Sequence, residues 1–395
     1  MKAGVFNFLA LDRVHFGVPA AEALQQEIAQ RASERVVIVT SRTLNRTTSV
    51  VTDLADTLGA RVVGVFDQCV EHTPRDSVIA LAAFLREARA DLVVSLGGGT
   101  VIDSVKIALL CLAQGVDQSD ALDQWHLKVN PDGSLHVPIV AAPPCRQIAI
   151  PTTLSGAEFS DLGGATDTRT GTKHGFTGRF IGPVAVILDP AMTLHTPERL
   201  WLSTGIRAVD HAVEAICARN AQPFLDALGL RALKQLGGSL NRFGSELVDP
   251  SRPGSLQGRL DCQIGAWLAA TSIRRADYGA SHGLGHALGA DAGVPHGITS
   301  CVLLPTVMRY NEEVCANALA EISAALGHPD QPAADLVEAL ISRLGLPTRI
   351  SELGVGRERL AVIAEKAMGN PFVRSNPRPI QSPAQTLEIL ERAWA

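Results

Sequence analysis

The stretch GIRAVDHAVEA, residues 205–215, combines a histidine with an arginine and an aspartate at helical spacing. Positions four apart lie on one face of a helix, so Arg207 and His211 are expected to point the same way. Asp210, next to His211, is expected to point aside. A histidine binds a metal or moves a proton, and an arginine grips a carboxylate by two parallel hydrogen bonds. The stretch therefore indicates either half of a metal site or a site for an anionic substrate.

Three further histidines fall within residues 279–311, GASHGLGHALGADAGVPHGITSCVLLPTVMRYN. His282 and His286 are four apart and share a helical face, and Pro295 before His296 is typical of a helix start. Three of the chain's eleven histidines in fifteen residues favour one shared site over separate core positions. The predicted catalytic residues are Arg207, His211, His282, His286 and His296.

Two Gly/Thr/Ser-rich stretches indicate a cofactor site. In SLGGGTVIDSVKIAL, residues 95–109, an apolar strand ends in three glycines and a helix follows. Glycines let the backbone approach a ligand closely, and the amide groups at a helix start favour an anion such as a pyrophosphate. PTTLSGAEFSD, residues 151–161, follows the apolar run QIAI and offers hydroxyl groups. The cofactor-binding candidates in these stretches are Gly97, Gly98, Gly99, Thr100, Asp103, Lys106, Thr152, Thr153, Ser155 and Glu158.

The elements that must position these residues divide the chain into two domains. Apolar, β-branched runs separated by helical stretches are typical of a parallel sheet covered on both faces. From about Leu194 onward the strand signal stops and apolar spacings of three and four predict helices. We predict an α/β dinucleotide-binding domain over residues 1–190 and an all-helical catalytic domain over residues 191–395, with a polar, Pro-rich insertion at 115–148. The expected strands are 35–40, 60–66, 91–96 and 185–189.

Composition limits the partners of the chain. A net charge of −5 and a pI near 6.1 provide no basic surface for nucleic acid or an anionic membrane, which leaves a small molecule as the expected partner. No apolar run reaches the roughly 18 residues that span a bilayer, and the N-terminus does not resemble a signal peptide. Seven cysteines without a CxxC pair suit free thiols in a reducing compartment. These features predict a cytoplasmic protein.

The motifs, in this order, resemble the iron-containing (group III) alcohol dehydrogenase family. GGGTxxDxxK, PTTxxGxE, the helix with His211, SHGxGH and VPHG cover the chain from about residue 30 to NPRPI near its end. The resemblance implies a dehydroquinate synthase-like fold, a nicotinamide cofactor and a homodimer. Family members hold a metal with one Asp and three His. The matching positions here are Arg207, His211, His282 and His296, so the acidic ligand is replaced by arginine.

This replacement points to one branch of the family. A guanidinium stays charged and repels a divalent cation, which argues against tight metal binding. The maleylacetate reductases also lack the acid, are understood to work without a metal, and resemble this chain in DHAVEA and NPRPI. The resemblance implies a reductase of maleylacetate, to 3-oxoadipate, or of another acidic oxo or enone compound, in aromatic compound degradation. The histidines would stabilise the enolate oxygen, and His282 is favoured as proton donor.

The turn after the expected strand 35–40, RVVIVT, bears on the choice of cofactor. In VTSRTLNR, residues 39–46, Ser41 stands where NAD-selective family members tend to carry an Asp. The nearby Arg42 and Arg46 favour a 2′-phosphate. We therefore expect NADPH to be accepted, alone or alongside NADH, unless both arginines are simply solvated surface residues.

Three other functions are compatible with the sequence. The first is an iron- or zinc-dependent alcohol or aldehyde dehydrogenase in which His211, His282 and His296 suffice to hold the metal. The second is a lyase of the dehydroquinate synthase type, which the missing acidic ligand at Arg207 disfavours. The third is a nucleotide-binding protein without catalytic activity.

Overall fold

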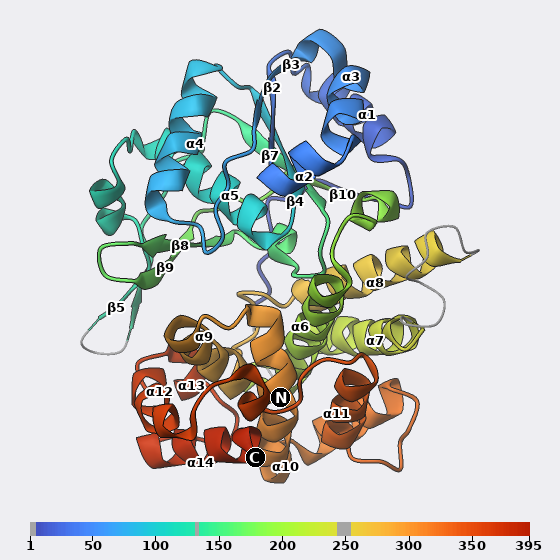
Figure 1. Cartoon of the computed structure of the whole chain (residues 1–395), viewed down its shortest axis with the longest axis vertical. Coiled ribbons are helices and arrows are strands. Elements are labelled where there is room, and N and C mark those ends of the chain that lie inside the picture. Colours follow the sequence, from blue (N-terminus) through green and yellow to red (C-terminus); the bar gives the residue numbers. More distant parts are fainter. Residues whose placement is uncertain (1–4, 131–133, 243–253) are drawn as a thin grey trace. The chain divides into compact units, whose positions relative to one another are not determined.

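The computed structural model describes residues 5–130, 134–242 and 254–395. It divides into two compact units, one formed by Phe8–His195 and the other by Thr196–Ala395 together with residues 5–7 (Figure 1). The boundary between the two units lies after His195, whereas from the sequence we predicted it after residue 190. Each unit has its own apolar core.

The N-terminal unit is built on a six-stranded parallel sheet, which confirms the predicted α/β class. The four expected strands are present, and the run QIAI forms a fifth. The remaining edge strand was not predicted, because RVHF is only four residues long and partly exposed. In sheet order the strands are β1 (Arg13–Phe16), β10 (Ala185–Leu188), β7 (Arg146–Pro151), β4 (Leu92–Gly97), β2 (Val36–Thr40) and β3 (Val62–Phe66).

Helices cover both faces of this sheet, which explains why its strands are apolar without alternation. Successive strand side chains point to opposite faces. Val37 and Val39 pack into a core with α4 and α5, and Val36 and Ile38 pack into a second core with α1 and α3. The helices of the unit are α1 (Ala20–Arg31), α2 (Arg42–Thr47), α3 (Val50–Leu58), α4 (Arg75–Glu87) and α5 (Gly99–Gln114).

Two small hairpins complete the unit. The predicted insertion at 115–148 contains a short 3₁₀ helix, Ser119–Gln124, and the antiparallel pair β5 (Lys128–Val129) and β6 (Leu135–His136). A second antiparallel pair, β8 (Leu162–Asp167) and β9 (Thr172–Thr177), follows the PTT stretch and was not predicted.

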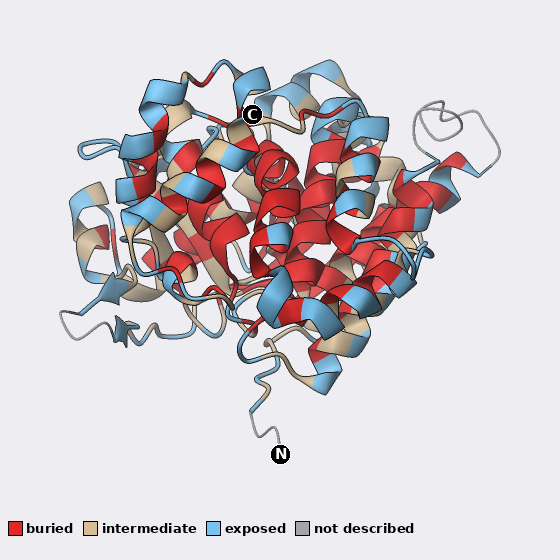
Figure 2. Ribbon diagram, turned by 90° about the horizontal axis from the view of Figure 1, so that it is seen from below, coloured by how far each residue is buried: buried red, intermediate tan, exposed pale blue. Residues whose placement is uncertain are grey.

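The C-terminal unit is all-helical, as predicted. Its helix α6 is buried from Trp201 through Ile216 and packs against α7, α8 and α10. A helix buried on every side lies inside its bundle rather than on the surface; Figure 2 shows the concentration of buried residues in such helices. No helix in the described ranges is long and apolar enough to cross a membrane. The helices are α6 (Glu198–Cys217), α7 (Pro223–Leu240), α8 (Ser255–Ala270), α9 (Ala280–Ala292), α10 (His296–Ala325), α11 (Ala333–Arg343), α12 (Leu360–Ala367), α13 (Pro371–Arg374) and α14 (Pro383–Trp394).

Candidate active site

A carboxylate and two imidazoles form a continuous hydrogen-bonded row in the core of the helical unit. Nδ1 of His282 lies 2.7 Å from Oε2 of Glu214, and Nε2 of His282 lies 3.0 Å from Nδ1 of His211. Glu214 and His211 come from α6, and His282 comes from the first turn of α9. One proton therefore lies between Glu214 and His282, and one between the two rings. Such a row can pass a proton from one end to the other.

Glu214 is fixed by the start of helix α9. Its carboxylate accepts hydrogen bonds from the backbone N–H groups of Gly279 at 2.9 Å, Ser281 at 2.8 Å and His282 at 3.4 Å. The first N–H groups of a helix lack partners within the helix and bind an anion. Glu214 thus holds α9 against α6, and this contact fixes the position of the His282 ring.

Asn376 supports the same helix start from the C-terminal NPRPI segment. Its Oδ1 accepts the N–H of Ala280 at 3.0 Å, and its Nδ2 donates to Oδ1 of Asn311 at 2.7 Å. The side chain is completely buried. The phrase NPRPI therefore has a structural role next to the histidines, which the resemblance alone did not reveal.

An aromatic side chain fixes the imidazole rings in place. Tyr278 stacks on His282 with ring centroids 4.2 Å apart, and its ring centroid lies 5.3 Å from that of His211. The Tyr278 hydroxyl is 2.7 Å from Oγ of Ser272. Burial raises the pKa of Tyr278, so the phenol stays neutral and acts as packing for the two rings.

Arg207 lies in the same core and is held by an aspartate and a serine. Its Nη1 donates to Oγ of Ser300 at 3.0 Å and lies 3.4 Å from Oδ2 of Asp210. Ser300 and Ser281 each donate a hydrogen bond to Asp210, at 2.6 and 3.0 Å. Among the described residues, Nε and Nη2 of Arg207 have no hydrogen-bond partner. One edge of the guanidinium therefore has N–H donors that the described residues do not use.

A glycine allows the contact between α10 and α6 that brings Ser300 to Arg207. A Cβ atom on Gly297 would lie 2.7 Å from the backbone carbonyl of Ser203, closer than side-chain contacts allow. Pro295 precedes the first residue of α10, His296, which confirms the helix start predicted there.

Asp210 is buried and does not point to solvent. It lies on the Nδ1 edge of His282, with Oδ1 3.6 Å from that nitrogen, whereas His211 lies on the Nε2 edge. The expectation that Asp210 points away from His211 is consistent with this position. The sequence did not reveal its contacts with Arg207 and Glu214, although Asp210 and Glu214 are four residues apart on one helical face.

The charged groups of this core shift one another's proton affinity. Burial raises the pKa of Glu214 to about 8, and the nearby Asp210 carboxylate adds to the rise. Burial also raises the pKa of Asp210, against the opposing effect of Arg207. The pKa of His282 is held well below its usual value by burial, then by Arg207 and the other histidines. His282 is therefore neutral near pH 7.

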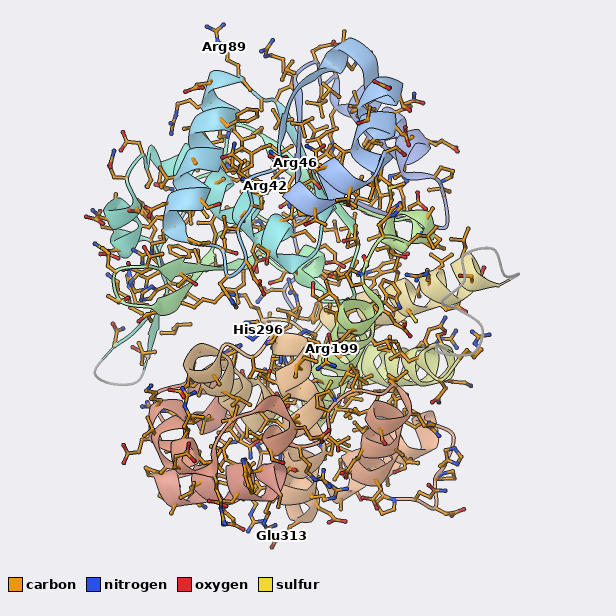
Figure 3. All side chains as sticks on the ribbon, viewed as in Figure 1. Arg42, Arg46, Arg89, Arg199, His296 and Glu313 are labelled. Atoms are coloured by element: carbon orange, nitrogen blue, oxygen red, sulfur yellow. The ribbon has the colours of Figure 1, made fainter. Side chains whose placement is uncertain are left out.

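The remaining two predicted histidines form a more open pair. His286 on α9 and His296 at the start of α10 have ring centroids 5.4 Å apart. Figure 3 shows His296 at the start of α10. His286 is half-buried, with Nδ1 3.3 Å from Nδ2 of Asn370, and His296 is exposed. Both rings act electrostatically on His282. The structure therefore brings together all five residues of the predicted catalytic set.

The donor atoms of this core fit a divalent cation poorly. Asp210, Glu214 and His282 present three potential ligand atoms within 4.8 Å of one another, and Oδ1 of Asp210 has no hydrogen-bond partner among the described residues. However, the His282 nitrogen in this group is the one bound to Glu214. A guanidinium 3.4 Å from the Asp210 carboxylate also adds a fixed positive charge, which repels a dication.

In the N-terminal unit, the glycine turn joins β4 directly to α5, as predicted. Gly98 is the residue before the helix, and Thr152 after β7 donates its N–H to the carbonyl of Gly97 at 3.0 Å. A Cβ on Gly98 would lie 3.0 Å from Cγ2 of Thr153, and one on Gly99 would lie 3.1 Å from Oγ of Ser155. The two Gly/Thr/Ser clusters thus pack against each other, and only glycine leaves the backbone of the turn accessible to a pyrophosphate.

The position of this turn in the sheet also suits a nucleotide. The chain runs from β2 to β3 on one side and from β4 to β7 on the other, so the strand order reverses between β2 and β4. Ligands of open parallel sheets bind beyond the carboxyl ends of the strands at such a point. Thr100 lies in the first turn of α5 at this edge, and Ser41 follows β2 beside it.

Three of the predicted cofactor residues, Asp103, Lys106 and Glu158, lie in one charged group, in which Lys106 and Glu158 are buried. The ammonium of Lys106 donates to Oδ1 of Asp103 and to the carbonyls of Ala157 and Leu162, at 3.0, 2.6 and 2.7 Å. Its three N–H groups are thereby used, and they tie α5 to the segment after β7. Burial raises the pKa of Glu158 to about 7, and its Oε2 has no hydrogen-bond partner among the described residues.

An aspartate that the sequence did not single out lies beside the predicted 2′-phosphate position. Asp67 follows β3 and accepts from Nδ2 of Asn45 at 3.0 Å and from Nε of Arg46 at 3.4 Å. These hydrogen bonds, with the charges of Arg46 and Arg42, lower its pKa. Arg42 and Arg46 extend from α2, which Ser41 caps (Figure 3). β3 pairs with β2 in parallel, with Val39 opposite Phe66, and this register places Asp67 beside Arg46. The sequence alone does not give this register.

Comparisons with known proteins show the family of this chain. The family model for iron-containing alcohol dehydrogenase matches residues 12–190. The family model for the C-terminal part of Fe-containing alcohol dehydrogenases matches residues 201–394. The dehydrogenase FUM7 of Gibberella moniliformis is 35% identical over 396 residues, which cover 92% of this chain and 92% of that protein. A maleylacetate reductase of Burkholderia cepacia is 30% identical over 398 residues, with 100% and 98% covered.

A solved structure extends the likeness to three dimensions. The crystal structure of maleylacetate reductase from Agrobacterium tumefaciens superposes with a TM-score of 0.81 at 29% identity and covers 100% of this chain and 99% of that one. The helical and the α/β unit are thus both matched over their whole length. The chain belongs to the iron-containing alcohol dehydrogenase family, in which it resembles the maleylacetate reductases, and is an oxidoreductase that uses a nicotinamide cofactor.

Proposed function

We propose that this protein is a metal-independent, NADPH- or NADH-dependent reductase of a small anionic oxo or enone substrate, maleylacetate being the first candidate. One observation carries the proposal: the core of histidines and carboxylates contains the guanidinium of Arg207, fixed by Asp210 and Ser300. Relatives about 30% identical that are named maleylacetate reductase support the same reading.

Arg207 would bind the substrate through a carboxylate. Its Nη1 is engaged by Ser300 and Asp210, so the Nε and Nη2 edge is the part available for two parallel hydrogen bonds to a carboxylate. The contacts on Nη1 restrict the rotation of the guanidinium, and this reduces the entropy lost on binding. A neutral alcohol or aldehyde would not use this group.

The row Glu214, His282 and His211 would deliver the proton. Reduction of an enone adds a hydride to one carbon of the double bond, places the electron pair on the ketone oxygen as an enolate, and ends with a proton on the neighbouring carbon. Both ring nitrogens of His282 are engaged, one by Glu214 and one by His211. We therefore propose that His211 delivers the proton to the substrate and that His282 supplies this proton to His211. The sequence alone favoured His282 as the proton donor.

The positive charge needed at the enolate oxygen would come from side chains. Arg207 supplies a permanent charge near the histidines, and a hydrogen bond from an imidazole stabilises the developing oxyanion. The electrostatic conflict between a guanidinium and a dication supports a reaction without a metal ion. No step of the proposed reaction then requires iron or zinc.

The glycine turn and the Thr/Ser cluster would hold the cofactor. Gly97 to Thr100 and Thr152 to Ser155 face the same sheet edge and suit a pyrophosphate, and bound nicotinamide supplies the hydride. Exposed Arg42 would bind a 2′-phosphate, whereas Arg46 is partly neutralised by Asp67. We propose that NADPH is used, with NADH as a second substrate.

The test is the oxidation of NADPH and of NADH with maleylacetate, measured on the enzyme as purified and after exhaustive chelation. A rate that survives chelation is the expected result. A rate that chelation abolishes and iron or zinc restores would instead assign a metal to His211, His282 and His296. Absence of any rate with maleylacetate, but turnover of another oxo acid, would retain the reductase and reject this substrate.

A further inference from the structure

Two cysteines meet where helices α6 and α10 cross. Cys217 is the last residue of α6, and Cys315 lies inside α10. The thiol of Cys315 donates a hydrogen bond to the backbone carbonyl oxygen of Cys217, at 3.8 Å. The two residues are 98 positions apart in the chain, so this contact is a feature of the fold.

The backbone at this contact departs from a regular helix. Cys315 has φ −114° and ψ 15°, which interrupts α10. Cys217 ends α6, and the next residue is already extended. Neither thiol is therefore fixed within a continuous helical turn, so small backbone shifts that bring the sulfurs to bonding distance disturb few helical hydrogen bonds.

The contact is near the protein surface. Cys217 is half-buried, and Cys315 beneath it is buried, with 6% of its surface exposed. Their neighbours Arg219 and Val314 are exposed. A small oxidant can reach the pair from the side of Cys217, whereas the thiols of Cys111, Cys262 and Cys301 are completely buried. The remaining half-buried cysteine, Cys69, lies in the other unit.

We propose that Cys217 and Cys315 are a redox-responsive pair that a hydroperoxide converts to an intramolecular disulfide. The thiolate of Cys315 attacks one peroxide oxygen, which breaks the O–O bond and gives a sulfenic acid and water or an alcohol. The sulfur of Cys217 then attacks the sulfenic sulfur, forms the S–S bond and releases water. In sum, two thiols lose two electrons and two protons, and the peroxide is reduced. A thiol reductant reverses the reaction.

The pKa values of the two thiols set the order of attack. A hydrogen bond between the side chains lowers the pKa of Cys315 and raises that of Cys217. The thiolate is the nucleophile in such reactions, so Cys315 reacts first and Cys217 resolves it.

The crosslink would join the two helices that hold the Arg207 site. Glu214 lies one turn before Cys217 on α6, and Ser300 is on α10. A covalent link between these helices closes a long loop and restricts the unfolded chain. We therefore expect the oxidised protein to unfold at a temperature several degrees higher than the reduced protein.

The test treats the full-length protein with hydrogen peroxide at a small molar excess, blocks free thiols and maps peptides by mass spectrometry. We expect two thiols to be lost, a crosslinked peptide pair containing Cys217 and Cys315, and full reversal by dithiothreitol. Cys217→Ser and Cys315→Ser should each remove the crosslink and the rise in melting temperature, whereas the control Cys69→Ser should leave both unchanged. Oxidation of Cys69 alone, or sulfinic acid at Cys315 with Cys217 still free in the native chain, would overturn the proposal.

Discussion

Nη1 of Arg207 and Oδ2 of Asp210 lie 3.4 Å apart on one helix, and the hydroxyl of Ser300 bonds to both. A buried charge is tolerated when it is paired and hydrogen-bonded. Asp210 is completely buried, so the charge of Arg207 is compensated by this carboxylate rather than by solvent. Arg207 therefore gives the site a fixed cation. A carboxylate at position 207 would instead attract a metal ion.

Replacing Arg207 should convert the site from anion binding to metal binding. Arg207→Asp places a further carboxylate beside Asp210 and the histidines, which favours a divalent cation. We expect at least a tenfold higher KM for an acidic substrate, about 1.4 kcal/mol, and bound zinc in the dialysed protein by elemental analysis. Arg207→Gln, which removes the charge without adding a ligand, should weaken acid binding but bind no zinc. A variant that kept its affinity for acids would contradict the proposed role of Arg207.

Removing the counter-ion should destabilise the helical unit. Asp210→Asn leaves the charge of Arg207 buried and unpaired, which costs about 3 kcal/mol, or roughly 10 °C in melting temperature. It should also tighten the binding of anionic inhibitors, because Arg207 is no longer neutralised. Calorimetry and inhibition constants measure the two effects, and the exposed Asp330→Asn serves as control. A melting temperature equal to that of the control would mean that Asp210 does not compensate Arg207.

Arg42 should determine how well NADPH binds. It is exposed on α2 and, among the described residues, acts on Asp67 only through its charge. Arg42→Ala is expected to raise the KM for NADPH on the order of tenfold, because the phosphate loses one charged hydrogen-bond partner. The KM for NADH should not change. Arg89→Ala, another exposed arginine of this unit, is the matched control. Equal effects on the KM values for both cofactors would show that Arg42 does not bind the 2′-phosphate.

Glu158 should make stability depend on pH. Burial raises its pKa from 4.5 to about 7 in the folded chain. A carboxyl whose folded pKa is raised contributes stability that is fully present below the unfolded pKa and is lost as the pH rises through the folded pKa. The melting temperature should therefore fall between about pH 5 and pH 7 by this contribution. Glu158→Gln keeps the shape and should flatten that part of the profile. A profile equal to that of the parent chain would assign the slope to other groups.

Local patterns in the sequence predicted the parts of the fold that depend on local chemistry. The apolar runs predicted β2, β3, β4 and β10, and the glycines after β4 predicted the turn and the start of α5. Pro295 predicted the start of α10. Each signal lies within a few residues of the feature that it indicates, because periodicity and capping are short-range effects.

Contacts between distant segments could not be predicted in this way. Asn376 reaches the start of α9 from nearly one hundred residues away, and Asp67 comes beside Arg46 only through the register of β2 and β3. Lys106 fits a cofactor motif, yet its ammonium is used within the fold. A motif gives residue types, whereas the direction in which a long side chain points is decided by partners elsewhere in the chain.

Glu214 should act on catalysis through His282 rather than through substrate binding. It accepts three backbone N–H groups and faces Nδ1 of His282, so it orients the ring and holds one proton of the row. In Glu214→Gln the amide nitrogen can only donate, which restricts His282 to one tautomer and interrupts proton transfer to His211. We expect kcat to fall on the order of 100-fold with KM for the acidic substrate unchanged, because Arg207 is untouched. Steady-state kinetics across pH measures both constants, with the exposed Glu313→Gln on α10 as control. If KM rose while kcat and its pH profile stayed constant, Glu214 would be a purely structural support for the binding site, and the proton would have to reach the substrate by another route.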